Sequence, residues 1–172
     1  MSDFDYILHP QWIVPIVPRD TVLCNHSLGV KDGRITFIGE RSATTGFTAD
    51  EHVELPQQAL LPGLVNCHGH AAMSLLRGYA DDFPLMTWLQ SHIWPAETEF
   101  VSEDFVRDGT DLALAELLLG GTTTFSDMYF YPDVTAERAD FVGLRAQLAF
   151  PVIDVPTAWA HSPEEYLAKG LK

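Results

Sequence analysis

Basic residues are scarce in this sequence of 172 residues, in which ten Lys and Arg stand against 24 Asp and Glu, for a formal net charge of −14. Phosphate binding needs a footprint of Lys and Arg, and an anionic membrane surface would repel such a chain. Neither nucleic acid nor a membrane is therefore expected as a partner. Cysteine is rare too, because Cys24 and Cys67 are the only two. No disulfide framework is therefore expected. We expect a reducing, cytoplasmic location instead.

Long apolar runs are also missing. The first ten residues carry acidic side chains where a signal peptide needs basic ones. No apolar run reaches the roughly 20 residues that a membrane-spanning helix requires. Hydrophobic residues nevertheless make up 47% of the chain, which is typical of a globular protein with a packed core. The length allows about one ordinary domain.

The first 60 residues have the pattern of β-structure. The pair Asp32-Gly33 lies between two runs of strand-forming residues. This predicts a hairpin with a type I′ turn, in which both central residues need a positive φ. Residues 41–50 are polar and rich in Gly and Thr, which indicates a loop. The predicted strands are residues 6–8, 12–14, 27–31, 34–38 and 51–55.

After residue 60, strands and helices are expected to alternate. The nearly continuous apolar run 60–66 is typical of a strand buried on both faces. Ser102 is a suitable N-cap, with Glu103 and Asp104 in the first helical turn. Alternation of this kind predicts a parallel sheet with right-handed crossovers. The predicted strands are 60–66, 122–126 and 145–152, and the predicted helices are 102–119, 134–142 and 164–172.

Two histidines follow the first of these strands, in the run Asn66-Cys67-His68-Gly69-His70. Residues two apart in a strand point to the same face, so His68 and His70 should project together while Cys67 points away. Two imidazoles on one face suit a divalent transition metal such as zinc. The pattern also fits two unrelated histidines at a strand end.

The run Leu61-Pro62-Gly63-Leu64-Val65-Asn66-Cys67-His68-Gly69-His70 closely resembles the first-strand motif of the amidohydrolase superfamily. A narrower resemblance is to the branch that contains 5′-methylthioadenosine/S-adenosylhomocysteine deaminases and triazine chlorohydrolases. The segments that carry it are 73–78, 81–82, 88–89, 94–97 and 120–124. The resemblance implies an α/β fold, a metal-dependent (β/α)8 TIM barrel with a small β-sandwich built from both chain ends.

On this resemblance, residues 1–60 would form the sandwich, completed by a missing C-terminal segment. Residues 61–172 would form the first part of the barrel, about three of its β/α units. A complete barrel takes roughly 250 residues, and the sequence stops inside a predicted helix. We therefore expect the chain to be the N-terminal piece of a larger fold, with the rest of the barrel on the same polypeptide. Relatives commonly assemble, so a homo-oligomer is also expected.

The resemblance assigns roles residue by residue. It implies that His68 and His70 bind the metal, which we expect to be Zn²⁺, with Fe²⁺ or another divalent ion as the alternative. It implies that Trp88 packs against the substrate and that Glu97 accepts hydrogen bonds from ribose hydroxyls. Arg145 matches an arginine that can reach the distal end of the substrate, although an arginine at the barrel bottom or an interface is an equal alternative.

Several other residues have open roles. Where the family often has a second arginine, this chain has residues 148–151, Leu-Ala-Phe-Pro. This departure favours a methylthio substrate over one that carries an amino acid. Asp127 could face the site, but a helix cap or a supporting hydrogen bond is the better expectation. His92 and His161 could lie near the site.

The expected function is metal-dependent hydrolytic deamination of an adenine nucleoside, 5′-methylthioadenosine or S-adenosylhomocysteine, to the inosine analogue and ammonia. The catalytic residues would lie beyond Lys172, so residues 1–172 alone should be inactive. The alternatives are a triazine-type chlorohydrolase, a guanine or cytosine deaminase, and a non-catalytic truncated barrel module. Glu97 distinguishes the nucleoside deaminase from the alternative enzymes, because only a ribosyl substrate offers its carboxylate a diol.

Overall fold

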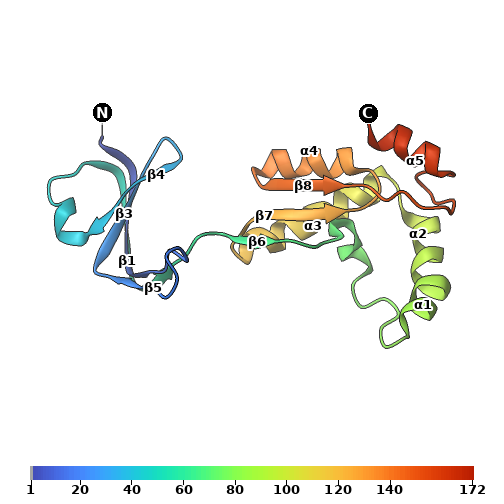
Figure 1. Cartoon of the computed structure of the whole chain (residues 1–172), viewed down its shortest axis with the longest axis horizontal. Helices are drawn as coiled ribbons and strands as arrows, with labels where there is room; N and C mark the ends of the chain where they lie inside the picture. Colours follow the sequence, from blue (N-terminus) through green and yellow to red (C-terminus); the bar gives the residue numbers. More distant parts are fainter. Residues whose placement is uncertain (1) are drawn as a thin grey trace. The chain divides into compact units, whose positions relative to one another are not determined.

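The computed structural model describes residues 2–172, which form two compact units that divide between Pro62 and Gly63 (Figure 1). The division falls two residues from the expected boundary after residue 60. Among residues 2–172, none of the helices combines the length and hydropathy of a transmembrane span. The two units are described separately.

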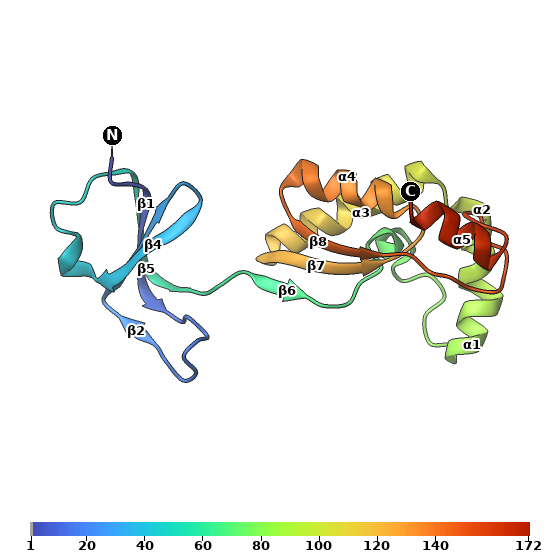
Figure 2. The same ribbon diagram turned by 45° about the horizontal axis from the view of Figure 1, so that its top comes forward.

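The first unit is a five-stranded sheet that curls around a small core (Figure 2). The strands are β1 (Phe4–Ile13), β2 (Leu23–Cys24), β3 (His26–Lys31), β4 (Arg34–Glu40) and β5 (Ala49–Leu60). They pair in the order β2-β1-β3-β4, all antiparallel, and β5 pairs with β1 in parallel. A second sheet is not present in residues 2–62, so the sandwich stays a prediction.

The hairpin between β3 and β4 is confirmed. Asp32 and Gly33 both have positive φ, of 52° and 69°, as a type I′ turn requires. The expected strands 6–8 and 12–14 are wrong as separate elements, since both belong to β1. Pro10 does not end β1, because the pairing with β5 shifts register between Pro10 and Trp12, and a bulge tolerates the missing amide hydrogen.

The loop expected over residues 41–50 is only partly present. A short 3-10 helix, η1 (Arg41–Thr44), occupies its start, and β5 begins at Ala49. β5 also continues to Leu60, well beyond the strand expected over 51–55. Pairing with the long strand β1 extends β5 because each added residue finds a backbone partner there.

The second unit contains a parallel three-stranded sheet in the order β6-β7-β8, as the alternating pattern predicts. Its strands are β6 (Leu64–Asn66), β7 (Thr122–Met128) and β8 (Arg145–Ala149). The helices after β6 are η2 (Ala71–Leu76), α1 (Leu85–Trp88), the π-helix η3 (Leu89–Ile93), α2 (Trp94–Phe100) and α3 (Glu103–Leu119). Helices α4 (Pro132–Val142) and α5 (Pro163–Gly170) follow β7 and β8. The helical stretch 85–100 was not expected from the pattern.

Local signals explain how these elements begin and pack. Ser102 caps α3 as expected, and its Oγ accepts a hydrogen bond from the Phe105 amide. Gly109 in α3 lets η2 approach closely, because a Cβ there would collide with the backbone of Ala72. Between the helices and the sheet, one apolar cluster contains Leu114, Phe125, Ala139 and Leu144.

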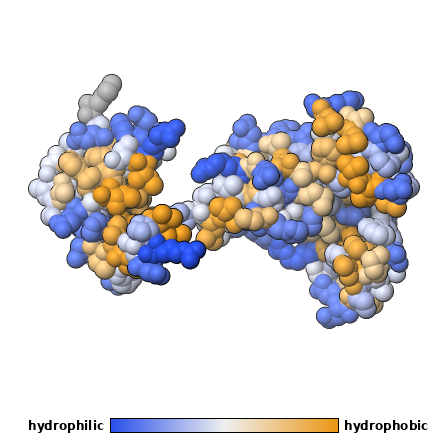
Figure 3. All heavy atoms as spheres, viewed as in Figure 1, coloured by the Kyte–Doolittle hydropathy of each residue, from blue (hydrophilic) through white to orange (hydrophobic). Residues whose placement is uncertain are grey.

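The expectation that the first barrel strand is buried on both faces is wrong for this structure. β6 is an edge strand that pairs only with β7 within the described residues. Leu64 and Val65 are 56% and 61% exposed, because no element of the second unit covers them. Hydrophobic side chains reach the surface in both units (Figure 3).

Candidate functional site

The carboxyl ends of β6 and β7 lie together and carry the polar residues of the site. His68 and His70 follow β6, and Asp127 and Met128 end β7. The Met128 amide donates a hydrogen bond of 3.2 Å to the carbonyl oxygen of Gly69. This bond holds the loop between the two histidines against the neighbouring strand. The parallel pairing of β6 with β7 therefore fixes how far both histidines lie beyond the carboxyl ends of the strands.

The two histidines lie side by side, although β6 ends at Asn66 and both follow it in a loop, so the alternation expected within a strand does not place them. Their ring centroids are 5.2 Å apart at an interplanar angle of 75°. The His70 Nδ1 lies 2.7 Å from the carbonyl oxygen of Met128. A carbonyl only accepts, so Nδ1 carries a proton, and in the neutral ring Nε2 is the nitrogen with a free lone pair. A backbone carbonyl on the other ring nitrogen is typical of a metal-binding histidine.

Asp127 holds the backbone that follows His70 in place. Its side chain is buried, and its Oδ1 accepts a hydrogen bond of 2.6 Å from the amide of Ala71, the first residue of η2. Burial raises the pKa of the Asp127 carboxyl, while the Ala71 amide and the nearby His70 oppose that rise. Asp127 thus anchors the backbone next to His70. The expectation of a cap or a supporting hydrogen bond fits this contact.

A cavity of about 360 Å³ opens beside His70. Trp88 and Glu97 line it together with His70, so three of the expected site residues come together from separate elements. The Trp88 Nε1 donates a long hydrogen bond of 3.4 Å to the carbonyl of Tyr79. The remaining lining is mainly apolar and consists of Met73, Leu85, Leu89, Ile93, Trp94, Met128, Tyr129, Phe130 and Pro151. The cavity can hold a mostly apolar ring system with a few polar groups.

Glu97 presents a carboxylate inside this cavity. The Tyr129 hydroxyl donates a hydrogen bond of 2.7 Å to its Oε1. Burial raises the pKa of Glu97, and the Tyr129 bond and His70 act in the opposite direction. Burial and the neighbouring Glu97 carboxylate likewise raise the pKa of Tyr129, which keeps its hydroxyl protonated as a donor. Oε2 has no hydrogen-bond partner within residues 2–172 and is available to a ligand.

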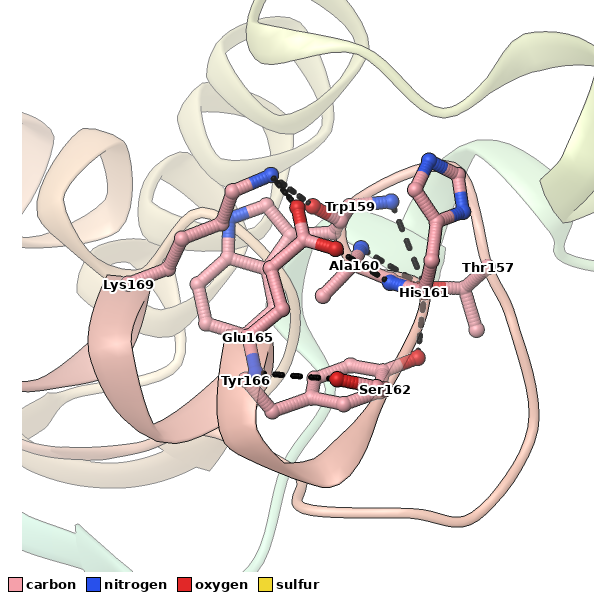
Figure 4. Close-up of polar contacts among 8 residues, drawn as sticks. All are labelled: Thr157, Trp159, Ala160, His161, Ser162, Glu165, Tyr166 and Lys169. Atoms are coloured by element: carbon pink, nitrogen blue, oxygen red, sulfur yellow. Dashed lines mark hydrogen bonds and ion pairs between the residues drawn. The ribbon is translucent and has the colours of Figure 1, made fainter.

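Three other candidates are not brought to this cavity. Arg145 is exposed and begins β8, so it lies at the amino end of the sheet, whereas the histidines lie at the carboxyl ends. Its substrate role stays a prediction that this geometry does not support. His92 packs on Phe83, with ring centroids 4.6 Å apart. His161 is exposed, and its amide donates to Glu165 at the start of α5 (Figure 4).

The side chains near His70 offer only part of a ligand set for a metal ion. Within residues 2–172, no group of three or more His, Cys, Asp or Glu side chains is placed to hold one. The two imidazoles fit a divalent ion by donor type, and the fixed tautomer of His70 fits as well. His68 and His70 are therefore suited to supply part of a ligand set.

Two groups that contribute to the site were not identified from the sequence pattern. Tyr129 belongs to the aromatic run Tyr129-Phe130-Tyr131, which by itself indicates core packing. Its position directly after the end of β7 is the signal that could have marked it. The carbonyl of Met128 has no sequence signal, since every residue has one.

Known proteins resemble this chain along almost its whole length. It is 54% identical over 169 residues to a 5-methylthioadenosine/S-adenosylhomocysteine deaminase of Saccharophagus degradans, and the match covers 98% of the chain and 38% of that protein. It is 44% identical to a 5'-deoxyadenosine deaminase of Methanosarcina barkeri, covering 88% of the chain and 34% of that protein. The chain thus spans well under half the length of these relatives.

A solved structure resembles the fold closely. An adenosine deaminase from Xanthomonas campestris with bound zinc superposes with a TM-score of 0.92 at 46% identity. This comparison covers 96% of the chain and 38% of that protein. The model of the Amidohydrolase family matches residues 59–171, which include the strand-end histidines and the cavity beside them. The chain therefore belongs to the amidohydrolase family.

Proposed function

We propose that this chain is the N-terminal part of a metal-dependent hydrolase that deaminates adenine nucleosides to their inosine analogues and ammonia. The carrying observation is the cavity in which the imidazole of His70, the indole of Trp88 and the carboxylate of Glu97 meet. The names of the relatives from Saccharophagus degradans and Methanosarcina barkeri support this substrate class. The whole fold would be a (β/α)8 barrel with a small β-sandwich.

The metal would be held by His68 and His70 together with residues outside this chain. Zinc is proposed because the Xanthomonas campestris structure contains it. A bound divalent ion of this kind supplies hydroxide at neutral pH by lowering the pKa of water to about 7. Met128 and Asp127 orient the ligands. The Met128 carbonyl accepts a hydrogen bond from His70 Nδ1, and the Asp127 carboxylate accepts one from the Ala71 amide.

Trp88 and Glu97 would bind and orient the nucleoside. An indole offers a large apolar face for the substrate. A carboxylate can accept hydrogen bonds from both hydroxyls of a ribose diol. Tyr129 holds Oε1 of Glu97, and Oε2 has no hydrogen-bond partner within residues 2–172. A triazine or a free guanine or cytosine base has no diol, so the alternative enzyme activities give this half-buried carboxylate no hydroxyl pair to bind.

The test uses the full-length protein that carries this chain, loaded with zinc, and measures the loss of adenine absorbance. We expect deamination of 5′-methylthioadenosine by the wild type. Glu97→Gln keeps the shape and an acceptor for Tyr129 but loses the charge, so KM should rise about tenfold or more. Glu99→Gln on the exposed side of α2 is the matched control and should leave KM unchanged.

Two results would contradict the proposal. One is the absence of turnover of every adenine nucleoside by the metal-loaded wild type. The other is a Glu97→Gln enzyme with an unchanged KM for the ribosyl substrate. A substrate lacking both ribose hydroxyls gives a further check, because it should be insensitive to the same substitution.

A further inference from the structure

Residues 85–100 form one uninterrupted helical column, although its middle is not α-helical (Figure 1). The π-helix η3 joins α1 to α2 without a break. At the end of η3, the Trp94 amide donates to the carbonyl of Leu89, five residues back. The Leu89 amide donates to the carbonyl of Leu85, four residues back, as in an α-helix. The column therefore takes one more residue in this turn than an α-helix would.

Side chains from both halves of this column line the cavity beside His70. The α1 half contributes Leu85 and Trp88, and the α2 half contributes Trp94 and Glu97. Trp88 and Glu97 are nine positions apart. An α-helix turns by about 100° per residue, so nine steps amount to about 900° and place two residues on opposite faces. A regular α-helix would therefore direct Trp88 and Glu97 away from each other.

The wide turn removes this mismatch. Because a π turn absorbs one residue, Trp88 and Glu97 are related like residues eight steps apart in an α-helix. Eight steps amount to about 800°, which is about 80° more than two full turns, so both side chains share one face. Gln90 and Ser91 lie within the turn, are exposed, and do not line the cavity.

Pro95 explains why the turn is wide. It is the second residue of α2 and has no amide hydrogen to donate. In an α-helix that ran through residue 95, its ring would collide with the carbonyl of Ser91, four residues back. The π-helix ends at Ile93, directly before α2. The irregular spacing thus lies where the proline excludes the α-helical one.

We propose that Pro95 is a positioning residue for the nucleoside site: it holds the π turn, and the turn keeps Trp88 on the face of the column that carries Glu97. The indole and the carboxylate are the groups that would bind the nucleoside, so one ligand reaches both only when they share a face. Pro95 does not line the cavity beside His70 and acts through the direction of Trp88. The inference rests on the proposed function.

The test measures KM and kcat of the zinc-loaded, full-length protein with 5′-methylthioadenosine. Pro95→Ala restores an amide hydrogen and allows the column to become α-helical, which turns Trp88 away from Glu97. KM should rise about tenfold, because the contact of the indole with the substrate is lost. Zinc content should stay unchanged, because His68 and His70 lie on another segment. KM does not depend on the fraction of protein that folds.

Deletion of Gln90 from the Pro95→Ala protein gives the sharpest comparison. The shortened column is a regular α-helix in which Trp88 and Glu97 are eight steps apart, so KM should return to within about twofold of the wild-type value. Gln90→Ala in the Pro95→Ala protein is the matched control, because it changes the same side chain without shortening the column. It should leave KM high. A general structural loss at position 95 would not be repaired by removing a further residue.

An unchanged KM in Pro95→Ala, or a high KM that the deletion of Gln90 does not lower, would overturn the inference. A wild type that deaminates no adenine nucleoside would instead overturn the proposed function. Crystal structures of the Pro95→Ala protein with and without Gln90 show the direction of Trp88 independently of turnover. Trp88 and Glu97 should lie on opposite faces in the longer protein and on one face in the shorter one, and the same face in both would contradict the role of Pro95.

Discussion

Each unit holds a histidine whose Nδ1 is hydrogen-bonded, and the two differ in burial and in what their other ring nitrogen does. In the first unit, His9 is 5% exposed, its Nδ1 lies 2.7 Å from Ser27 Oγ, and its Nε2 lies 3.2 Å from the His52 Nδ1. In the second unit, only Nδ1 of His70 has a hydrogen-bond partner among the described residues. His9 is a satisfied structural residue, while His70 has one nitrogen held in place and one available.

The difference shows that a hydrogen bond to one ring nitrogen does not by itself identify a functional histidine. Both side chains are oriented by a hydrogen bond to Nδ1 of 2.7 Å. His9 sits inside a sheet whose core surrounds it, whereas His70 sits at strand ends, where the fold opens into a cavity. A substitution at each position should therefore damage a different property of the protein.

The largest effect is expected at His70. His70→Ala in the full-length protein should lower the zinc content and reduce kcat/KM by about a thousandfold, because the bound ion contributes several kcal/mol to the barrier reduction. Metal analysis by mass spectrometry measures the first effect independently of activity. His9→Gln is the control and should keep both properties. Full zinc content in the His70→Ala protein would remove the distinction between the two histidines.

Tyr129→Phe comes next. The substitution removes the hydroxyl that orders Glu97 while preserving the aromatic packing against Phe130. We expect KM for 5′-methylthioadenosine to rise about tenfold with little change in kcat, because a hydrogen bond to a charged group is lost. Tyr131→Phe on the same aromatic run is the control. A fall in kcat at constant KM would assign Tyr129 to the chemical step instead.

Protonation of His9 should make the stability of the first unit depend on pH. Burial, with Arg41 and His52, lowers the pKa of His9 below 6.5, and only Glu54 opposes the shift. The unfolded chain therefore binds the proton more readily, so the stability of the first unit should fall as pH drops below about 6.5. Hydrogen exchange of β1 and β3 amides, corrected for the intrinsic rate at each pH, measures this loss.

His9→Gln should flatten that pH dependence while costing about 1–3 kcal/mol at pH 8, because a buried partner is left with a poorer bond. His26→Gln is the control, since the His26 ring bonds only the carbonyl of Cys24. An unchanged pH profile in His9→Gln would show that another group carries the titration.

The smallest effect is expected at the hairpin. Gly33 has a φ of 69° and open space where a Cβ would lie. Gly33→Ala should lower the free energy of unfolding by about 1 kcal/mol through backbone strain alone. Arg34→Ala, next to the turn, is the control. Denaturant unfolding measures both, and neither should alter nucleoside turnover.

Much of the local structure could be predicted because its causes are local. The Asp32-Gly33 turn, the Ser102 cap and the alternation of strands with helices each depend on residues close in the chain. His68 and His70 also lie close together, but they follow the end of β6 in a loop that the Met128 amide holds, so strand alternation does not explain their pairing. The predicted ends of the strands were less accurate, because β1 and β5 become longer by pairing with each other across a long separation in the sequence.

The sequence by itself determined which chemical groups are present and, through short-range spacing, that two imidazoles lie near each other. The tertiary structure decided which distant residues join them. Tyr129 reaches Glu97 across 32 positions and Asp127 reaches Ala71 across 56. Parallel strands bring their carboxyl ends together whatever the chain length between them, so only the folded structure reveals that the Tyr129 hydroxyl holds Glu97 in the cavity beside His70.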